Sequence, residues 1–280
     1  MIATRSGGIA IFSVILILTS FLYVEKNQIF DFSILLPLGI LFIAGIYDDI
    51  YDSDFKLKFL FQIIAAKIIV DQGILINDLN GLFGIFEIPY LVAQPLTMLF
   101  IVTVVNSFNF TDGIDGLALF EFIKFSILVF YLSDNFLFGF NFLALIALCV
   151  SIVLLYFNFR KEKKIFLGDG GSLFLGGLIS IIIIGFINSS QNNFNALNST
   201  IILYLYPLVD LIRIVIIRIY RRKSPYKADK NHIHHILLKQ GITQFNASTI
   251  ICITFLIVQI LVLNIAWWWQ PWIKIKVSWF

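Results

Sequence analysis

The sequence has few charged residues and very few cysteines. Charged residues make up 13% of the 280 residues, whereas a typical soluble domain carries about 25%. Hydrophobic residues make up 59%. A core of that size is too large for one water-soluble domain, so we expect the surrounding solvent to be lipid. The two cysteines, Cys149 and Cys252, both lie within apolar runs, which argues against a disulfide scaffold or a metal cluster.

Long apolar runs dominate what the sequence does contain. A helix needs about 20 mainly apolar residues to cross the hydrocarbon core of a bilayer. The candidate spans are 7–24, 29–47, 59–76, 92–110, 116–132, 138–157, 172–189, 200–220 and 247–268. We find neither a repeat nor a linker among them. The sequence therefore predicts an all-α, polytopic integral membrane protein with about nine transmembrane helices, folded as a single transmembrane domain over residues 1–280.

The basic residues between these spans fall mostly on one side of the membrane. The connecting segments on the side of the N-terminus are 1–6, 48–58, 111–115, 158–171 and 221–246. They hold 13 lysines and arginines, against three on the opposite side. By the positive-inside rule, the basic side is the cytoplasm. With nine spans, the N-terminus would be inside and the C-terminus outside.

Two polar clusters on that side are rich in carboxylates. Asp48, Asp49, Asp52 and Asp54 follow the second span, and adjacent carboxylates either raise a pKa or require a cation. A solvated helix cap is the alternative. The stretch 106–116, Asn-Ser-Phe-Asn-Phe-Thr-Asp-Gly-Ile-Asp-Gly, crowds polar groups where they are energetically expensive. Its glycines would let a ligand approach the backbone closely, although a tight turn could also use them.

Two further clusters combine cations with features that favour phosphate. Residues 158–164 hold a basic run, and residues 168–172, Gly-Asp-Gly-Gly-Ser, open a helix whose free N–H groups favour anions. The run alone is more often a positive-inside anchor, and Asp169 alone would be a helix cap. All three histidines fall within 232–235, which suggests phosphate contacts, general acid–base chemistry or a metal. Zinc is disfavoured, because no cysteine is near and the other clusters supply hard oxygen ligands.

An even number of spans separates the four clusters, so they must face the same compartment. Carboxylates, amides, glycines and cations together at a cytoplasmic membrane surface describe a divalent-metal site for phosphate chemistry. A lipid or sugar-phosphate transporter is an alternative from another class of protein. It would place polar residues near the bilayer midplane, where these spans hold few charges. An enzyme is therefore the preferred interpretation.

The clusters also resemble a known family, the polytopic polyprenyl-phosphate N-acetylhexosamine-1-phosphate transferases of glycosyltransferase family 4, relatives of the phospho-MurNAc-pentapeptide translocase. The resemblance covers nearly the whole chain in order. Its blocks are Arg5-Ser-Gly-Gly, Asp48-Asp49-x-x-Asp52 with Lys58, Asn106-x-x-Asn109-x-x-Asp112-Gly-Ile-Asp115-Gly, Asn158 and Phe166 with Gly168-Asp169-x-Gly171-Ser172, and Asp229-x-Asn231-His232-Ile-His234-His235. The last block is similar to the branch that uses UDP-N-acetylhexosamines.

The resemblance implies transfer of a HexNAc-1-phosphate from a UDP-N-acetylhexosamine to undecaprenyl phosphate, with release of UMP. It implies Mg²⁺ as the cofactor, or Mn²⁺ in its place. The expected location is the bacterial cytoplasmic (inner) membrane, where the active site would face the cytoplasm and start O-antigen or other cell-surface polysaccharide synthesis. Membrane lipid surrounds such enzymes and homodimers are common among them, while no nucleic acid is expected as a partner.

The resemblance also implies a role for each matching residue. Asp169 and Asn109 would hold the metal, and Asp112 would serve the same end of the site. Asp48 and Asp49 would act on the lipid phosphate, either as a base or through the metal. Lys58, His232, His234 and His235 would neutralise the diphosphate as its charge grows. Arg5, Gly113, Ile114, Asp115, Asn158 and Phe166 would bind substrate, the last five around the uridine, with Phe166 stacking on the base.

The chain departs from the family pattern at its start. Family members generally carry another span and a basic segment before the Arg-x-Gly-Gly block, whereas Met1 lies four residues before Arg5. The resemblance therefore implies a family bundle that lacks the first helix, with a weakened nucleotide site. Ile236 also stands where relatives commonly carry arginine. A truncated, inactive relative that serves as an assembly subunit is thus a second alternative to the enzyme.

Overall fold

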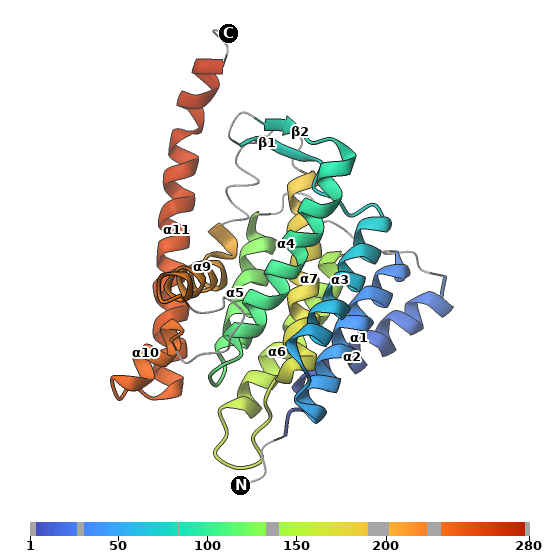
Figure 1. The fold of residues 1–280 in the computed structure, drawn as a ribbon, viewed down its shortest axis with the longest axis vertical. Helices are drawn as coiled ribbons and strands as arrows, with labels where there is room; N and C mark the ends of the chain where they lie inside the picture. Colours follow the sequence, from blue (N-terminus) through green and yellow to red (C-terminus); the bar gives the residue numbers. More distant parts are fainter. Residues whose placement is uncertain are drawn as a thin grey trace.

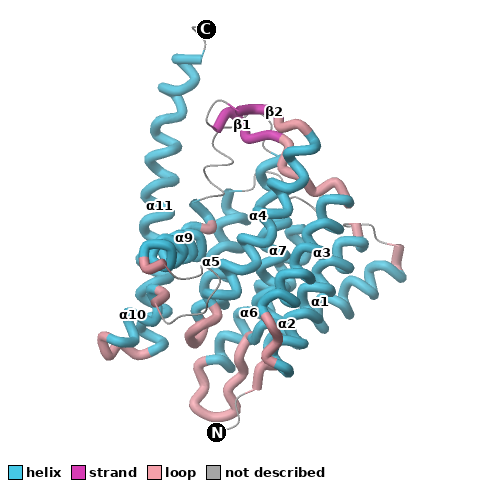
Figure 2. The backbone as a smooth tube through the Cα atoms, in the orientation of Figure 1, coloured by secondary structure: helices cyan, strands magenta, loops and turns pink. Residues whose placement is uncertain are grey.

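Helices make up most of the structure. The computed structural model describes residues 4–26, 31–82, 85–132, 140–189, 202–222 and 231–277. Its helices are α1 (Gly7–Val24), α2 (Leu35–Tyr51), α3 (Phe55–Asp71), α4 (Tyr90–Thr111), α5 (Leu117–Leu132), α6 (Phe140–Asn158), α7 (Gly168–Ser189), α9 (Leu205–Tyr220), α10 (Ile233–Lys239) and α11 (Gln244–Val277). A 3-10 turn, η1 (Phe32–Ile34), precedes α2, and β1 (Asp78–Leu82) pairs with β2 (Ile85–Glu87) in an antiparallel hairpin. The predicted all-α polytopic fold is confirmed, with this small hairpin added (Figure 1 and Figure 2).

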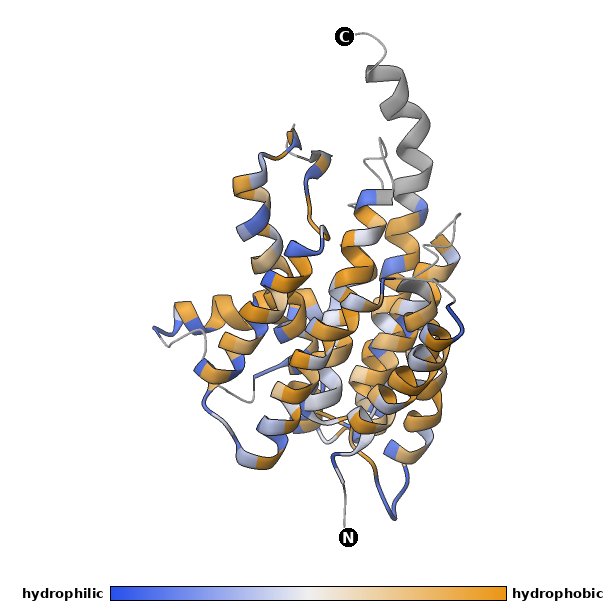
Figure 3. Ribbon diagram, turned by 90° about the vertical axis from the view of Figure 1, so that its right-hand side faces the viewer, coloured by the Kyte–Doolittle hydropathy of each residue, from blue (hydrophilic) through white to orange (hydrophobic). Residues whose placement is uncertain are grey.

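The lengths of the helices agree with a protein that crosses a membrane. Each predicted span overlaps one of the helices, and apolar residues cover most of their length (Figure 3). The segments long and apolar enough to cross a bilayer are Gly7–Val24, Phe32–Tyr51, Tyr90–Thr111, Gly168–Asn188 and Gln244–Asn264. Helices α3, α5 and α9 have only 16 or 17 residues. The chain is therefore an integral membrane protein, whereas the count of nine spans and the sidedness of the loops stay predictions.

Helix α7 lies at the centre of the bundle. Nearly all of its residues between Gly168 and Asn188 are buried, and α1, α2 and α4 pack around it (Figure 1). Gly8 of α1 and Gly45 of α2 lie against its first turn. A methyl group on either glycine would overlap main-chain atoms of residues 169–171. The end of α2 and the start of α7 are therefore held at backbone contact.

Helices α9, α10 and α11 form a second, smaller cluster beside this bundle. Its buried core contains Ile114, Leu117, Tyr206, Ala247 and Ile251. Helix α9 is seen end-on in Figure 1, whereas α4, α7 and α11 run along the vertical, so α9 lies across the direction of the bundle. The sequence predicted a span at 200–220 but gave no sign of this crossing. Its direction carries the polar residues of α9 toward the histidine segment.

The segment before α1 pairs with the segment before α7. Thr4 and Ile165 form a parallel bridge, and the N–H of Phe166 donates to the carbonyl of Thr4 at 2.8 Å. The N–H groups of Gly7 and Gly8 donate to the carbonyls of Phe166 and Leu167, both at 2.9 Å. These bonds satisfy donors at the start of α1 that have no partner within the helix. The two segments are therefore joined through their main chains.

Candidate active site

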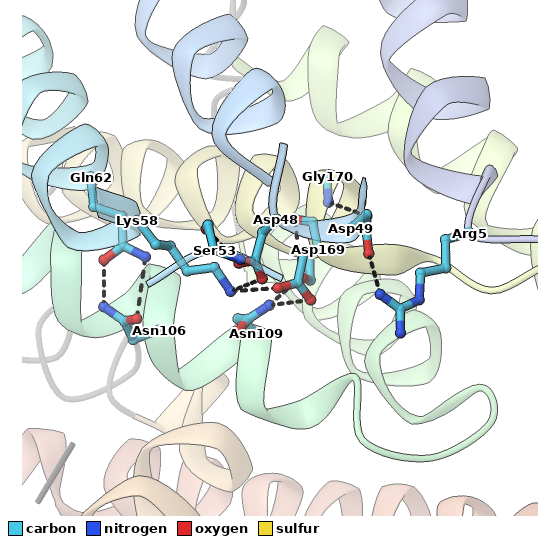
Figure 4. Close-up of polar contacts among 11 residues, drawn as sticks. Arg5, Asp48, Asp49, Ser53, Lys58, Gln62, Asn106, Asn109, Asp169 and Gly170 are labelled. Atoms are coloured by element: carbon cyan, nitrogen blue, oxygen red, sulfur yellow. Dashed lines mark hydrogen bonds and ion pairs between the residues drawn. The ribbon is translucent and has the colours of Figure 1, made fainter. Parts of the chain in front are cut away.

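Three helices meet at the ammonium group of Lys58, and a fourth contacts one of its partners. This residue lies in the first turn of α3, and its Nζ is 2.7 Å from Oδ2 of Asp48 in the last turn of α2. The same ammonium pairs with the carboxylate of Asp169 in the first turn of α7 (Figure 4). Asn109 of α4 donates its Nδ2 to Oδ1 of Asp169 at 3.2 Å. The structure thus brings together four of the predicted residues that lie far apart in the sequence.

Asp49 and Arg5 form a neighbouring contact. Nη1 of Arg5 donates to Oδ1 of Asp49 at 3.3 Å, and Oδ2 of Asp49 accepts the N–H of Gly170 at 3.1 Å (Figure 4). The sequence suggested that free N–H groups at the start of α7 receive a phosphate. In the structure, the Asp49 carboxylate takes one of these donors, and the helix dipole favours its negative charge there.

These groups belong to a cleft of about 450 Å³ at the end of the bundle. Its walls contain ten of the fifteen predicted site residues, namely Arg5, Asp48, Asp49, Asp112, Gly113, Ile114, Asp115, Asn158, Phe166 and Asp169. Lys58 and Asn109 do not line the cleft themselves but contact Asp169, which does. The three histidines also lie outside its walls. The ring of His234 lies against Gly113 of the cleft wall, and the shared surface of the histidines and the carboxylates stays a prediction.

Asp210 of α9 fixes the position of the histidine segment. Its Oδ2 lies 2.6 Å from Nδ1 of His232, and its Oδ1 accepts the N–H of Ile233 at 2.9 Å. Arg213 donates from Nη1 to the carbonyl of Asn231 at 2.8 Å. A hydrogen on Nδ1 of His232 is thus held by a carboxylate, which leaves Nε2 for another partner.

Asp115, Asn158 and Phe166 form another part of the cleft wall. Lys164 pairs with the carboxylate of Asp115, and its Nζ lies 5.1 Å from the centre of the Phe166 ring. Asn158 donates from Nδ2 to the carbonyl of Ile165 at 2.8 Å. Its Oδ1 is buried and has no hydrogen-bond partner within the described part of the chain. This part of the cleft wall therefore combines an aromatic face, a cation and an unsatisfied hydrogen-bond acceptor.

Two residues near Asp115 and Phe166 were not assigned to the site from the sequence. Gln244, at the start of α11, lines the cleft, and its Oε1 accepts the N–H of Asp115 at 3.2 Å. Lys164 belongs to the basic run that a positive-inside anchor also explains. A single glutamine carries no signal of its own, and the basic run marks Lys164 only as one of several cations. The packing of α11 against the turn after α4 brings Gln244 into place.

The cleft carries a high density of negative charge. Six aspartates and one arginine line it. Burial, followed by the nearby carboxylates of Asp169 and Asp49, raises the pKa of Asp112 well above its usual range. Carboxylates this close favour either protonation or a bound cation. A phosphate would bind in the cleft only together with positive charge that offsets these carboxylates.

The residues around Lys58 fit a magnesium ion that is completed by a substrate. Among the described residues, no three side chains of His, Cys, Asp or Glu gather into a metal-binding group. However, the carboxylates of Asp48 and Asp169 converge on the ammonium group of Lys58, and the amide of Asn109 contacts Asp169. Mg²⁺ is usually bound by one or two carboxylates together with substrate phosphates rather than by an all-protein cage. The two carboxylates and the amide oxygen are metal ligands of that kind.

His234 lies in a loop helix outside the membrane-spanning segments and is almost fully buried. A Cβ on Gly113 would lie 2.5 Å from its Nε2, so the ring sits directly behind the wall of the cleft. Burial, with smaller contributions from His235 and His232, lowers the pKa of His234 to about 3. The side chain is therefore neutral at pH 7 and adds no positive charge to the site.

This pKa predicts that acid destabilises the protein. The unfolded chain takes up a proton on His234 below its usual pKa of about 6.5, whereas the folded chain does so only near 3. The free energy of unfolding therefore falls as the pH drops through that window. We expect the apparent Tm of the detergent-solubilised protein to fall between pH 7 and pH 5, and H234Q to show a smaller fall. An identical slope in both proteins would refute a buried neutral histidine.

The fold and the cleft together define a polytopic membrane protein with an acidic site at one end of its bundle. Residues 31–187 match the sequence profile described as glycosyl transferase family 4. The chain belongs to this family.

Its relatives carry closely similar names. A Bacillus subtilis (strain 168) protein named "Probable undecaprenyl-phosphate N-acetylglucosaminyl 1-phosphate transferase" is 35% identical over 254 residues, which cover 86% of this chain and 67% of the relative. An "Undecaprenyl-phosphate alpha-N-acetylglucosaminyl 1-phosphate transferase" of Yersinia pestis is 29% identical over 258 residues, 88% of this chain and 68% of that protein. The protein of the same name from Escherichia coli (strain K12) is 26% identical over 224 residues, 76% of this chain and 59% of that protein.

Proposed function

We propose that the protein is a sugar-1-phosphate transferase that moves a HexNAc-1-phosphate from a UDP-N-acetylhexosamine to undecaprenyl phosphate and releases UMP. The observation that carries this proposal is the convergence of Asp48, Asp169 and Lys58 from three helices beside a cleft that Asn158 and Phe166 also line. The names of the relatives support undecaprenyl phosphate as the acceptor. The proposed site faces the cytoplasm of a bacterial inner membrane, and the product starts a cell-surface polysaccharide.

The reaction exchanges one phosphorus–oxygen bond for another. An oxygen of the lipid phosphate attacks the phosphorus that is linked to the sugar, and the bond from that phosphorus to the bridging oxygen breaks. The bridging oxygen leaves with UMP. Lipid phosphate is largely ionised near pH 7, since the second pKa of a phosphate monoester is about 6. No strong base is then needed, and the main requirement is to hold two anions together while charge grows on the leaving phosphate.

The charges in the cleft suit that requirement. When bound, Mg²⁺ supplies positive charge to the diphosphate and to the leaving oxygen. Asp48 and Asp169 would hold it from two helices, with Asn109 beside them. Lys58, which pairs with these carboxylates, and Arg5 of the Asp49 pair would supply positive charge to phosphate oxygens. Fixed cations around a developing negative charge stabilise the transition state without further reorganisation.

The proposal is tested by the release of UMP. The purified protein in detergent is supplied with UDP-GlcNAc, undecaprenyl phosphate and Mg²⁺, and the initial rate of UMP formation is measured. We expect UMP only when the lipid is present, and its loss when EDTA removes divalent cations. UDP-GalNAc and other UDP-N-acetylhexosamines form a donor panel. If no donor yields UMP above the reaction without lipid, the proposed function is wrong.

A further inference from the structure

A pair of amide side chains joins α3 to α4 one helical turn away from Lys58. Nε2 of Gln62 donates to Oδ1 of Asn106 at 3.2 Å, and Nδ2 of Asn106 donates to Oε1 of Gln62 at 2.6 Å (Figure 4). Nδ2 of Asn106 also donates to the carbonyl of Val102 at 2.8 Å. Gln62 is only 1% exposed. Each amide therefore gives and receives a hydrogen bond across the boundary between the two helices.

These hydrogen bonds can form in only one register of α3 against α4. The other buried residues of α3 are apolar, namely Ala65, Ala66, Ile69 and Val70. Apolar contact has no preferred direction, whereas a hydrogen bond weakens steeply when its distance or angle changes. A shift of one helix along the other would also leave the buried amide of Gln62 without a partner, at the full cost of desolvating it. A single buried polar contact fixes the register of coiled coils in the same way.

The amide pair lies on the same helix faces as two residues of the candidate site. Gln62 follows Lys58 by four positions in α3, and Asn106 precedes Asn109 by three positions in α4. Residues at these spacings are neighbours on one face of a helix. Lys58 and Asn109 both contact the carboxylate of Asp169. The register of α3 against α4 therefore sets where the ammonium group and the amide meet on this carboxylate.

We propose that Gln62 and Asn106 are positioning residues for turnover, because they hold Lys58 and Asn109 at the separation that the transition state requires. This inference rests on the proposed function, since it concerns the cation and the amide of that same site. A displacement of about 1 Å can lower a rate by about 10²-fold. The charge that Lys58 stabilises grows as the bond to the leaving phosphate breaks. Loss of the amide pair should therefore lower kcat and change the KM for the UDP-sugar little.

The first test is Asn106→Leu, measured as UMP release with the best donor of the panel and with saturating lipid and Mg²⁺. The variant leaves the buried amide of Gln62 unpaired, so the apparent Tm is expected to fall by about 2–8 °C. We expect kcat to fall at least about tenfold, because the register is no longer fixed. The KM for the donor is expected to stay within about twofold of wild type.

The double variant Gln62→Met/Asn106→Leu separates positioning from stability. Two apolar side chains of similar shape leave no amide unpaired, so most of the lost Tm should return. The apolar pair has no directional contact, however, and kcat is expected to stay at least about tenfold below wild type. A pair that served stability alone would regain the rate together with the Tm.

Thr97→Val is the matched control on α4. Thr97 is fully buried, and its Oγ1 accepts the N–H of Ile76 at 2.9 Å and donates to the carbonyl of Ala93 at 2.7 Å. Nine residues separate it from Asn106, which is about 13 Å along the helix. Valine keeps the shape of threonine but leaves the Ile76 N–H without its partner. We expect a fall in Tm like that of Asn106→Leu, with kcat within about twofold of wild type.

The inference is wrong if the double variant regains both the Tm and the rate. It is also wrong if Thr97→Val lowers kcat as much as Asn106→Leu at an equal loss of Tm, and this comparison decides the matter even where the double variant stays unstable. In both cases the proposed function stands, because the wild-type protein still releases UMP. If the wild-type protein releases no UMP with any donor, the proposed function fails and this inference fails with it.

Discussion

Replacing Asp169 by asparagine is expected to slow UMP release by about 10³-fold or more while leaving the protein folded. Its carboxylate pairs with Lys58 and accepts from Asn109, and an amide of nearly the same size keeps that space filled. The amide lacks the charge that would hold a divalent cation against the diphosphate. Removing one preorganised electrostatic contact costs about 10²–10³-fold in rate, and loss of a metal ligand should cost at least as much. The measurement is the initial rate with UDP-GlcNAc, lipid and Mg²⁺ at saturation.

Asp71→Asn is the control for this variant. Asp71 also pairs with a lysine, Lys67, but it lies at the other end of α3, about 20 Å along the helix from Lys58. The rate of the Asp71→Asn variant is expected to stay within about twofold of wild type, because exposed ion pairs contribute little to stability. The rise in apparent Tm on adding Mg²⁺ is a second readout, which D169N should lose. An Asp169→Asn protein that keeps a tenth of the wild-type rate would remove this residue from the metal site.

Replacing Gly45 by alanine is expected to damage both stability and turnover. The added Cβ would lie 2.2 Å from the carbonyl oxygen of Asp169 and 2.5 Å from the nitrogen of Gly170, so α2 and α7 would have to separate. Overpacking of this kind costs about 1–3 kcal/mol of stability. The shift would also move Asp48 and Asp49 away from Asp169, and a displacement of about 1 Å can lower a rate by about 10²-fold. Thermal unfolding and the UMP assay measure the two effects.

Gly39→Ala on the same helix separates this contact from any general effect of alanine in α2. A Cβ at Gly39 would lie 3.7 Å from Cζ of Phe12, which is ordinary van der Waals contact. We expect an unchanged rate and an equal or higher Tm, because alanine favours a helix by up to about 1 kcal/mol over glycine. If Gly45→Ala behaved like Gly39→Ala, the backbone contact between α2 and α7 would not set the geometry of the site.

The sequence predicted the helices and most of the cleft because both follow from simple patterns. Apolar length marks the helices. Counting spans placed the carboxylates of Asp48, the 106–116 stretch and Asp169 at one end of the bundle, and ten residues suggested from the motifs line one cleft. The spans and their clusters need only the order of residues along the chain, whereas Arg5, Asn158 and Phe166 were implied by the family resemblance.

The pairings inside the site depend on packing and could not be predicted. Lys58 was expected to neutralise a diphosphate, yet in the structure its ammonium lies between Asp48 and Asp169. The histidines were expected to act as cations, but the burial that makes His234 neutral appears only once the second cluster of helices packs beside the bundle. Gln244 reaches the cleft for the same reason. Hydropathy cannot foresee a helix such as α9, whose direction rather than its composition is unusual.

The main-chain pairing before α1 and α7 has a consequence for the size of the substrate. Arg5 belongs to one of the paired segments and Phe166 to the other. The N–H of Phe166 donates to the carbonyl of Thr4, and the N–H of Thr4 donates to the carbonyl of Lys164. Backbone bonds allow little sliding, so the separation between Arg5 and Phe166 is set by the main chain. The site would then favour a substrate with the length of a nucleoside diphosphate. A sugar donor with one phosphate fewer, or one more, would contact either Arg5 or Phe166 but not both at once.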